Sequence, residues 1–226
     1  LKHHIGKERL TEMSVQDKLE EFRKEQEGYI EPSFATISAY GANAAMCHYS
    51  ATKESDTVLE DHGFYLVDSG GQYYEGTTDI TRTIALGELT EEEKEHFTLV
   101  LISMLRLKEV KFLYGCRGLS LDYVAREPFW SRGLNFDHGT GHGVGYLLNV
   151  HERPNGIRFR MVPERHDNGV LEAGMITSDE PGLYIEGSHG IRTENLMLCR
   201  KAEKNMYGQF MRFEFVTMVP IDLDGI

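Results

Sequence analysis

Four carboxylates and one histidine of this chain lie in segments rich in glycine, threonine or serine. The segments are DSGGQYYEGTTDITRT at 68–83, HGTGHGVG at 138–145, TSDEPGLY at 177–184 and GIRTEN at 190–195. The first and third contain sequences typical of ordinary turns, whereas the second places two histidines among many glycines. Together, in this order, they indicate a metal site formed by Asp68, Asp79, His142, Glu180 and Glu194. Such a site requires a fold in which distant parts of the chain converge.

The chemistry of these five residues favours two divalent ions over one. Bridging carboxylates hold such ions about 3.5–4 Å apart. Four carboxylates nearly neutralise two M²⁺ ions, whereas without metal they would repel one another and some would take up protons. An oxygen-rich set with a single imidazole suits Mn²⁺, with Co²⁺, Fe²⁺ or Zn²⁺ as alternatives. Because a water that bridges two cations is hydroxide near neutral pH and attacks carbonyl carbons, the set predicts a hydrolase.

The composition limits the kinds of partner that the chain can bind and the cellular compartment in which it is expected. The net charge of -12 argues against a nucleic-acid partner, which would require clustered Lys and Arg. No apolar run approaches about 20 residues, which argues against a membrane span, and no signal peptide is recognised. Cys47, Cys116 and Cys199 lack CxxC spacing, as is typical of reduced thiols in an intracellular protein. The length suits one domain. The start at Leu1 predicts a piece of a longer polypeptide.

The pattern of apolar and polar residues predicts three helices and a larger number of strands. The helices are expected at 11–26, with Ser14 and Asp17 resembling a capping box, at 90–114 and at 120–133. Strands are expected at 34–40, 64–67, 79–86, 175–178, 196–199 and 212–219. A hairpin connection is expected at 70–76 and a glycine-rich loop at 139–145. Strands and helices that do not alternate regularly favour the α+β class.

The chain carries a faint internal repeat. A strand, an acidic residue, a turn, a second acidic residue and a second strand occur at Asp68 and Asp79, and again at Glu180 and Glu194. This repeat predicts two related halves, each of which supplies two carboxylates from a hairpin.

These motifs resemble those of the catalytic domain of Xaa-Pro aminopeptidases (aminopeptidase P), in metallopeptidase family M24. The resemblance runs from the segment 32–38 to the segment 213–220. It implies a pita-bread fold with pseudo-symmetric halves around a curved antiparallel sheet, and one catalytic domain over residues 1–226. It also implies the ligand roles. Asp68 would bind one metal, His142 and Glu180 the other, and Asp79 and Glu194 would bridge both.

The resemblance implies roles for further residues near the metals. Glu180 is similar to the family's proton shuttle, and His48 to a histidine that lines the active site. His138 and His151 match histidines that hydrogen-bond the substrate and stabilise the tetrahedral intermediate. Arg192 matches an arginine that orients carboxylates near the metals. The remaining histidines are expected on the surface or in structural positions: His3, His4, His62, His96, His166 and His189.

The segment 145–152 is slightly extended and resembles the three-domain intracellular type of aminopeptidase P. That type has two non-catalytic domains before the catalytic one, lies in the cytoplasm and is commonly a homodimer. The resemblance therefore implies a substrate peptide with proline in second position, from which the first residue is removed. Two departures lie outside the ligands: Phe215 occupies a position that carries proline in relatives, and the chain stops soon after Asp224, where relatives continue with a helix.

Four alternatives remain open from the sequence. A prolidase would cleave Xaa-Pro dipeptides with the same five ligands, and a non-catalytic peptide-binding module could use the same fold. A creatine-type amidinohydrolase shares the fold but lacks the metal set. A soluble α+β domain in which the carboxylates never meet is the fourth.

Overall fold

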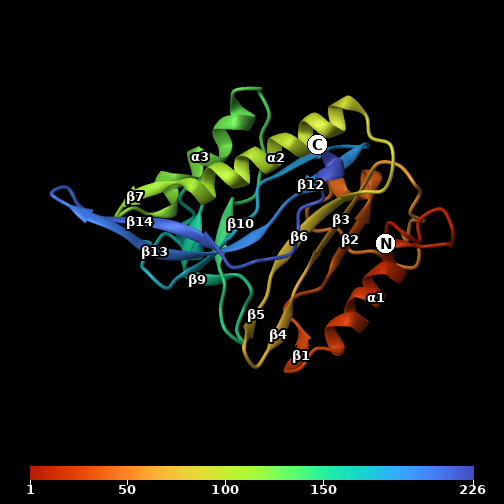
Figure 1. Cartoon of the computed structure of the whole chain (residues 1–226), viewed down its shortest axis with the longest axis horizontal. Coiled ribbons are helices and arrows are strands. Elements are labelled where there is room, and N and C mark those ends of the chain that lie inside the picture. Colours follow the sequence, from red (N-terminus) through yellow and green to blue (C-terminus); the bar gives the residue numbers. More distant parts are fainter.

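The computed structural model describes residues 1–226 and contains three α-helices and fourteen β-strands. Every sheet ladder between these strands is antiparallel. Helices α2 (Glu91–Glu109) and α3 (Gly118–Trp130) lie side by side along one edge of the molecule, and α1 (Glu12–Lys24) lies on the other side (Figure 1). Antiparallel sheets with separate helices form the predicted α+β class. None of the helices has the length and apolar character needed to cross a bilayer.

The N-terminal half contains two three-stranded sheets. In the first, β3 lies between β2 and β6, and α1 packs against β2. In the second, β4 lies between β1 and β5. The strands cover β1 (Tyr29–Pro32), β2 (Ile37–Tyr40), β3 (Phe64–Ser69), β4 (Gly71–Tyr73), β5 (Gly76–Thr77) and β6 (Ile80–Ala85).

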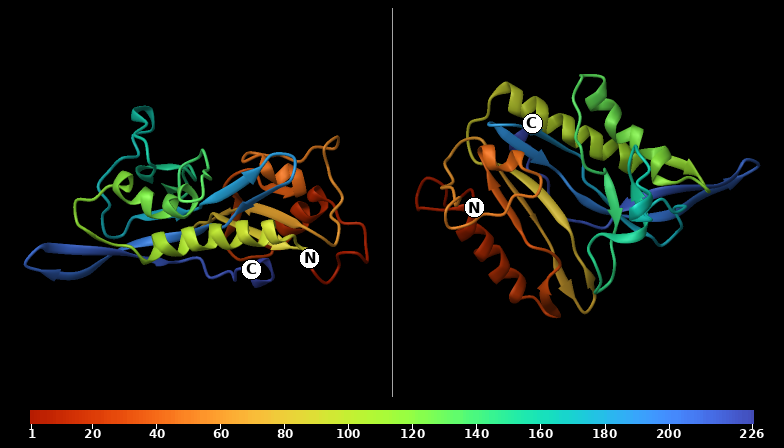
Figure 2. Two further views of the ribbon diagram at one scale, coloured as in Figure 1. Left: turned by 90° about the horizontal axis from the view of Figure 1, so that it is seen from above. Right: turned by 180° about the vertical axis from the view of Figure 1, so that it is seen from behind.

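The C-terminal half contains a six-stranded sheet in the order β7–β14–β13–β10–β8–β9 and a separate hairpin of β11 and β12. The long hairpin of β13 and β14 projects from the body of the molecule (Figures 1 and 2). The strands cover β7 (Lys111–Leu113), β8 (Gly141–Gly143), β9 (Glu152–Ile157), β10 (Ile176–Asp179), β11 (Gly182–Ile185), β12 (His189–Arg192), β13 (Asn195–Asn205) and β14 (Gly208–Phe215).

The strand order shows the predicted internal repeat. β3 pairs with β6, and the small hairpin β4–β5 is inserted between them. β10 pairs with β13, and the hairpin β11–β12 is inserted between them. In each half the acidic residues of the motif stand where the paired strands end and begin. The two halves therefore present their carboxylates in the same way.

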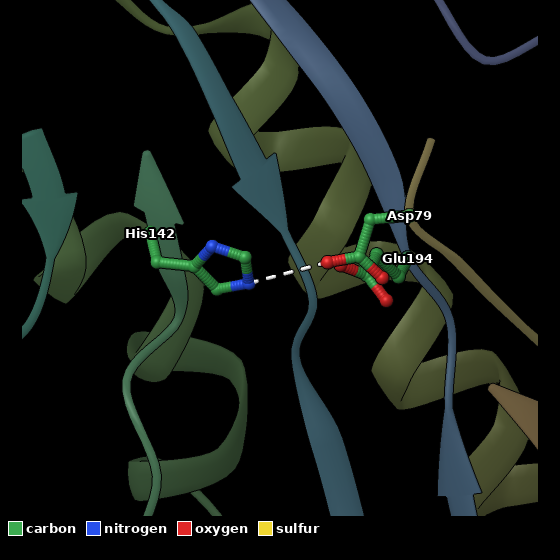
Figure 3. Close-up of side chains that lie close together, drawn as sticks. All are labelled: Asp79, His142 and Glu194. Carbon is green, nitrogen blue, oxygen red and sulfur yellow. Dashed lines mark ion pairs between the residues drawn. The ribbon is translucent and has the colours of Figure 1, made fainter. Parts of the chain in front are cut away.

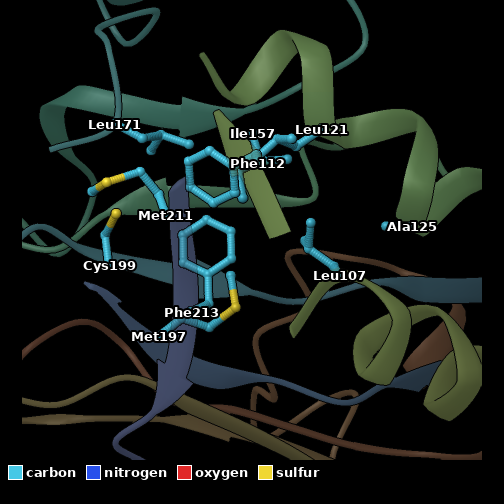
Figure 4. Close-up of a cluster of buried hydrophobic side chains, with 10 residues drawn as sticks. All are labelled: Leu107, Phe112, Leu121, Ala125, Ile157, Leu171, Met197, Cys199, Met211 and Phe213. Carbon is cyan, nitrogen blue, oxygen red and sulfur yellow. The ribbon is translucent and has the colours of Figure 1, made fainter. Parts of the chain in front are cut away.

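Two apolar cores meet along α2. Its Leu107 belongs to a cluster of ten buried residues, drawn in Figure 4, that α3 and the strands β7, β9, β13 and β14 complete. Phe97 and Val100 of the same helix belong to a second cluster, with Phe64 of β3 and Ile191 of β12. Because one helix contributes to both cores, it joins the two halves.

The predicted second helix is too long at its C-terminus. α2 ends at Glu109, Val110 is extended, and residues 111–113 form β7 against β14. Phe112 is buried in the first core, whereas Lys111 and Leu113 are exposed. This alternation is that of a strand, and pairing with β14 outweighs the helical pattern of the sequence.

The predicted cap of the first helix was also wrong. Thr11, rather than Ser14, is the N-cap, and the capping box joins Thr11 to Ser14. Tertiary contacts also hold this turn, since the buried Glu12 side chain accepts hydrogen bonds from the backbone N–H groups of Tyr40 (2.7 Å) and Thr57 (3.1 Å).

Other predicted elements are present with shifted boundaries. The connection at 70–76 forms the hairpin β4–β5, and the glycine-rich loop at 139–145 contains β8. The last predicted strand begins earlier, at Gly208, and ends at Phe215.

The second core yields a stability prediction. Phe97 is 1% exposed and stacks on Phe64 with ring centroids 5.5 Å apart. Phe97→Ala should lower the free energy of unfolding by about 3–5 kcal/mol, because the cavity is enclosed by both halves. Chemical denaturation measures this change. Phe22→Ala is the control, since Phe22 is 51% exposed on α1 and its loss should change the value by about 0.5 kcal/mol or less. Equal losses would contradict the prediction.

Candidate metal centre

Three of the five predicted ligands converge directly. One ligand atom each of Asp79, His142 and Glu194 lies within 4.8 Å of the others, and all three residues are buried (Figure 3). Asp79 immediately precedes β6, Glu194 immediately precedes β13, and His142 is the central residue of β8. The site therefore lies where strands of both halves of the repeat meet.

Asp68 and Glu180 complete the group. Glu180 Oε1 lies 3.2 Å from His142 Nε2, and Asp79 Oδ2 lies 3.4 Å from the same nitrogen. Asp68 pairs across the sheet with Thr81, two residues after Asp79. The structure thus brings all five residues together and excludes the alternative in which the carboxylates never meet.

The backbone and hydroxyl groups around the site orient the ligands. His142 Nδ1 donates to the Gly143 carbonyl at 3.0 Å, which leaves Nε2 free toward the carboxylates. Ser178 Oγ donates to Glu180 Oε1 at 3.0 Å, and Thr81 Oγ1 donates to Glu194 Oε2 at 2.7 Å.

Among the five predicted ligands, two carboxylate oxygens are buried without any hydrogen-bond donor. They are Asp68 Oδ1 and Glu194 Oε1, while the other oxygen of each group accepts from Arg192 and Thr81 respectively. Both carboxylate oxygens of the neighbouring Asp179 are also buried without a donor. A buried polar atom without a partner is costly. Mn²⁺ binds carboxylate oxygens. Because Asp68 Oδ1 and Glu194 Oε1 have no protein donor, they are available as ligands, and the residues therefore fit divalent ions.

Burial and mutual repulsion raise the pKa values of Glu180 and Glu194. Burial raises the pKa of Glu180 to about 7, with the charges of Asp79 and Asp68 adding to the effect and His142 opposing it. Burial, followed by the charges of Asp79, Glu180 and Asp68, raises the pKa of Glu194 well above its usual range. Burial lowers the pKa of His142, but the nearby Asp79 and Glu180 outweigh it and raise the pKa to about 9.

Arg192 connects the two halves of the site. From β12 it donates through Nη2 to Asp68 Oδ2 at 2.7 Å and through Nε to Thr81 Oγ1 at 3.2 Å. Nη1 donates to the Tyr184 hydroxyl at 2.8 Å. With only 3% of its surface exposed, the guanidinium is fixed by these partners. This geometry suits the orienting role that the sequence predicts for it.

Tyr184 was not predicted from the sequence. Its hydroxyl lies 2.8 Å from His138 Nε2, while His138 Nδ1 donates to the Gly139 carbonyl at 2.8 Å. Because Arg192 donates to the phenol oxygen, the phenol proton points to His138. Burial lowers the pKa of His138 to about 3, so its ring is neutral. Its place in the TSDEPGLY segment could have pointed to a role for Tyr184 in the site, but its hydrogen-bond partners lie in other segments.

The other predicted histidines differ in exposure. The ring of His151 stands edge-on to His142 with centroids 4.2 Å apart, and its residue is exposed. Partial enclosure and the charge of His142 lower the pKa of His151 to about 4. His48 is exposed and lies close enough to His138 for its charge to lower the His138 pKa. The roles of His48, His138 and His151 stay predictions.

Two histidines expected in structural positions form a buried pair. His96 Nδ1 of α2 lies 2.9 Å from His189 Nε2 of β12, and the two residues are 7% and 1% exposed. They join the helix to the strand that carries Arg192.

The model of metallopeptidase family M24 matches residues 2–201. The chain belongs to this family. A protein of Saccharomyces cerevisiae that bears the name of an Xaa-Pro aminopeptidase is 46% identical over 96% of the chain, and an aminopeptidase P of Paracoccidioides brasiliensis is 44% identical over 94%. The chain spans 28% and 34% of these two relatives, about a third of their length.

Solved structures of the family share the fold. An X-prolyl aminopeptidase from Caenorhabditis elegans, described as a cytosolic enzyme with a di-nuclear active site, gives a TM-score of 0.90 at 38% identity over 97% of the chain and 35% of that protein. A prolidase from Pyrococcus furiosus gives 0.78 at 32% identity over 94% of the chain and 57% of that protein. The predicted pita-bread fold and the predicted resemblance to Xaa-Pro aminopeptidases of the M24 family are confirmed.

The pKa values predict how metal and pH together affect stability. Without metal, folded Glu180 keeps its proton from its ordinary value of 4.5 up to about 7, whereas the unfolded chain loses it, so the free energy of unfolding falls as pH rises through this window. The raised pKa of His142 acts in the same direction up to about 9. Because metal binds the deprotonated groups, Mn²⁺ should raise the unfolding temperature more at pH 8 than at pH 5. Calorimetry of chelator-treated protein tests this, and equal shifts would contradict it.

Tyr184 yields a second prediction. Tyr184→Phe leaves an Arg192 donor and the His138 Nε2 acceptor without a partner, so the free energy of unfolding should fall by about 1–3 kcal/mol. Denaturant titration measures the change. Tyr123→Phe is the matched control because Tyr123 is 58% exposed on α3, and a loss as large as that of Tyr184→Phe would sink the prediction.

Proposed function

We propose that this chain is the catalytic domain of a metal-dependent aminopeptidase that hydrolyses the bond between an N-terminal residue and a following proline. The observation that carries the proposal is the convergence of four carboxylates and His142, with buried oxygens of Asp68 and Glu194 that lack donors. The names and similarity of the curated relatives support the reaction type. The aminopeptidase neighbour is also more similar in fold and sequence than the prolidase neighbour.

The five residues would hold two divalent ions, for which we propose Mn²⁺. By the resemblance, Asp68 would bind one ion, His142 and Glu180 the other, and Asp79 and Glu194 would bind both. When bound, such ions polarise a carbonyl group and lower the pKa of water to near neutrality. The protein supplies the arrangement of the ligands and a buried site.

Glu180 suits proton transfer. A proton shuttle needs access to the substrate. Glu180 is more accessible than Asp79 or Glu194, since 17% of its side chain is exposed compared with 5% and 1% of those residues. We propose that Glu180 carries the proton to the prolyl nitrogen as the peptide bond breaks.

The histidines would act on the substrate at the entrance of the site. His151 is exposed beside His142 and, with its pKa of about 4, is neutral near pH 7. We propose that it donates a hydrogen bond to the oxygen on which negative charge develops. Both ring nitrogens of His138 have protein partners, so we propose that it acts through the Tyr184 hydroxyl. His48 would line the site near His138.

The substrate would be a peptide with proline in second position. We propose a cytoplasmic location, which the description of the nematode neighbour supports. Because the curated relatives are about three times as long, we also propose that further domains accompany this one in the whole protein. A homodimer remains a prediction from the resemblance.

The proposal predicts that Asp79→Asn abolishes activity. Removal of a group that only hydrogen-bonds to a metal ligand lowers affinity or activity by about 10–100-fold. Loss of a bridging ligand itself should therefore lower the turnover number by at least about 100-fold. Mn²⁺-dependent release of the first residue from an Xaa-Pro-Yaa tripeptide by the full-length protein measures this. Asp17→Asn, at an exposed position on α1, is the control.

The same assay separates the alternatives. Release from the tripeptide with little turnover of an Xaa-Pro dipeptide supports the aminopeptidase. The reverse preference indicates a prolidase. Mn²⁺ binding without release from either peptide by the full-length protein indicates a binding module and refutes the proposed reaction.

A further inference from the structure

A buried ion pair lies on α3, outside the five ligands. Asp122 and Arg126 are one helical turn apart, and Arg126 Nε donates to Asp122 Oδ2 at 2.6 Å. Their side chains are 0% and 1% exposed. Removing two charges from water is costly unless every polar atom finds a partner, so the remaining contacts of the pair indicate what it holds.

Arg126 holds the segment that carries His138. Nη1 donates to the Phe136 carbonyl at 2.5 Å and to Asn135 Oδ1 at 3.0 Å, and Nη2 donates to the His138 carbonyl at 2.7 Å. The faces of the guanidinium are covered by the rings of Phe136 and Phe159, with centroids 3.9 and 4.5 Å away. Both the edges and the faces of the group are therefore occupied.

Asp122 holds the next part of the same segment. Its Oδ1 accepts from Thr140 Oγ1 at 2.7 Å. The Thr140 carbonyl in turn accepts from the backbone N–H of Glu180 at 2.9 Å, and Thr140 is fully buried. A continuous path of hydrogen bonds thus leads from the helix to the backbone of Glu180.

The hydrogen bonds of Asp122 and Arg126 are directional, whereas an apolar pair in the same position would make no directional contacts. Apolar side chains of equal volume could hold α3 in place. They would not determine the positions of the carbonyl groups of residues 136 and 138 or of the Thr140 hydroxyl. Functional groups need support that keeps them within about 0.5 Å of the working geometry.

We infer that Asp122 and Arg126 are positioning residues of the metal centre. Arg126 sets the place of His138, and Asp122 sets the place of Glu180 through Thr140. The expected effect on turnover rests on the proposed function, whereas the expected effect on Mn²⁺ affinity rests on the ligand geometry alone.

The test uses Thr140→Val and Arg126→Lys in the full-length protein. Thr140→Val removes the hydroxyl at nearly equal volume, and Arg126→Lys keeps the charge but loses the planar fork of donors. Each should weaken Mn²⁺ binding, measured by calorimetric titration, and lower the turnover number on the Xaa-Pro-Yaa peptide by about 10–100-fold. Thr140→Ser, which keeps the hydroxyl, should restore both values to within about threefold of the unmodified protein.

Leu121→Ala is the control for a purely structural role. Leu121 is buried in the first core on the same helix, 5% exposed, and belongs to none of the hydrogen bonds described above. It should lower the unfolding temperature at least as much as Thr140→Val while Mn²⁺ affinity and turnover stay unchanged. If Thr140→Val leaves Mn²⁺ affinity and turnover unchanged, as Leu121→Ala should, or if Thr140→Ser is as impaired as Thr140→Val, the inference is refuted, whether or not Arg126→Lys folds. If the unmodified protein binds Mn²⁺ but releases no residue, the proposed function fails and the Mn²⁺ affinities still decide the inference.

Discussion

The burial of four carboxylates around one imidazole is the constraint on which the rest of the structure depends. Like charges at such short distances in a medium of low dielectric constant repel strongly, and burial adds a solvation cost to each. Arg192 offsets part of this by pairing with Asp68 at 2.7 Å. The buried oxygens of Asp68 and Glu194 still lack donors, which fits a site that divalent cations would complete. The glycine-rich segments and the hydroxyls of Thr81 and Ser178 serve to hold this otherwise unfavourable group together.

The repeated hairpins explain how one chain can assemble such a group. In each half, the two paired strands end or begin at or beside an acidic residue, and the inserted hairpin leaves these residues close together. The second inserted hairpin also carries Tyr184 and Arg192, which connect it to Asp68 of the first half. α2 packs against the cores of both halves, so the relative position of the two pairs of carboxylates depends on apolar packing away from the site.

The sequence predicts most of the fold and the five residues that converge, because short local patterns indicate both. Alternating and helical periods gave the strands and helices, and the motifs named the five residues that converge. The end of α2 was mispredicted because pairing of β7 with β14 is a tertiary effect. The cap at Thr11, in contrast, is a local capping box with Ser14 and could have been predicted. Tyr184 and Arg126 could not be assigned roles from sequence, since each acts on groups in distant segments. Sequence patterns relate residues that are close along the chain, whereas these contacts form only after folding.

The different surroundings of the carboxylates indicate how the work is divided among them. Glu194 is 1% exposed, accepts a hydrogen bond from Thr81 and has its backbone N–H bound to the Thr81 carbonyl, which suits a group that must stay in place. Glu180 is partly exposed, is held through one oxygen by Ser178, and has a pKa of about 7. Access to the substrate suits the proton-shuttle role proposed for Glu180. Its backbone is also tied through Thr140 to the ion pair on α3.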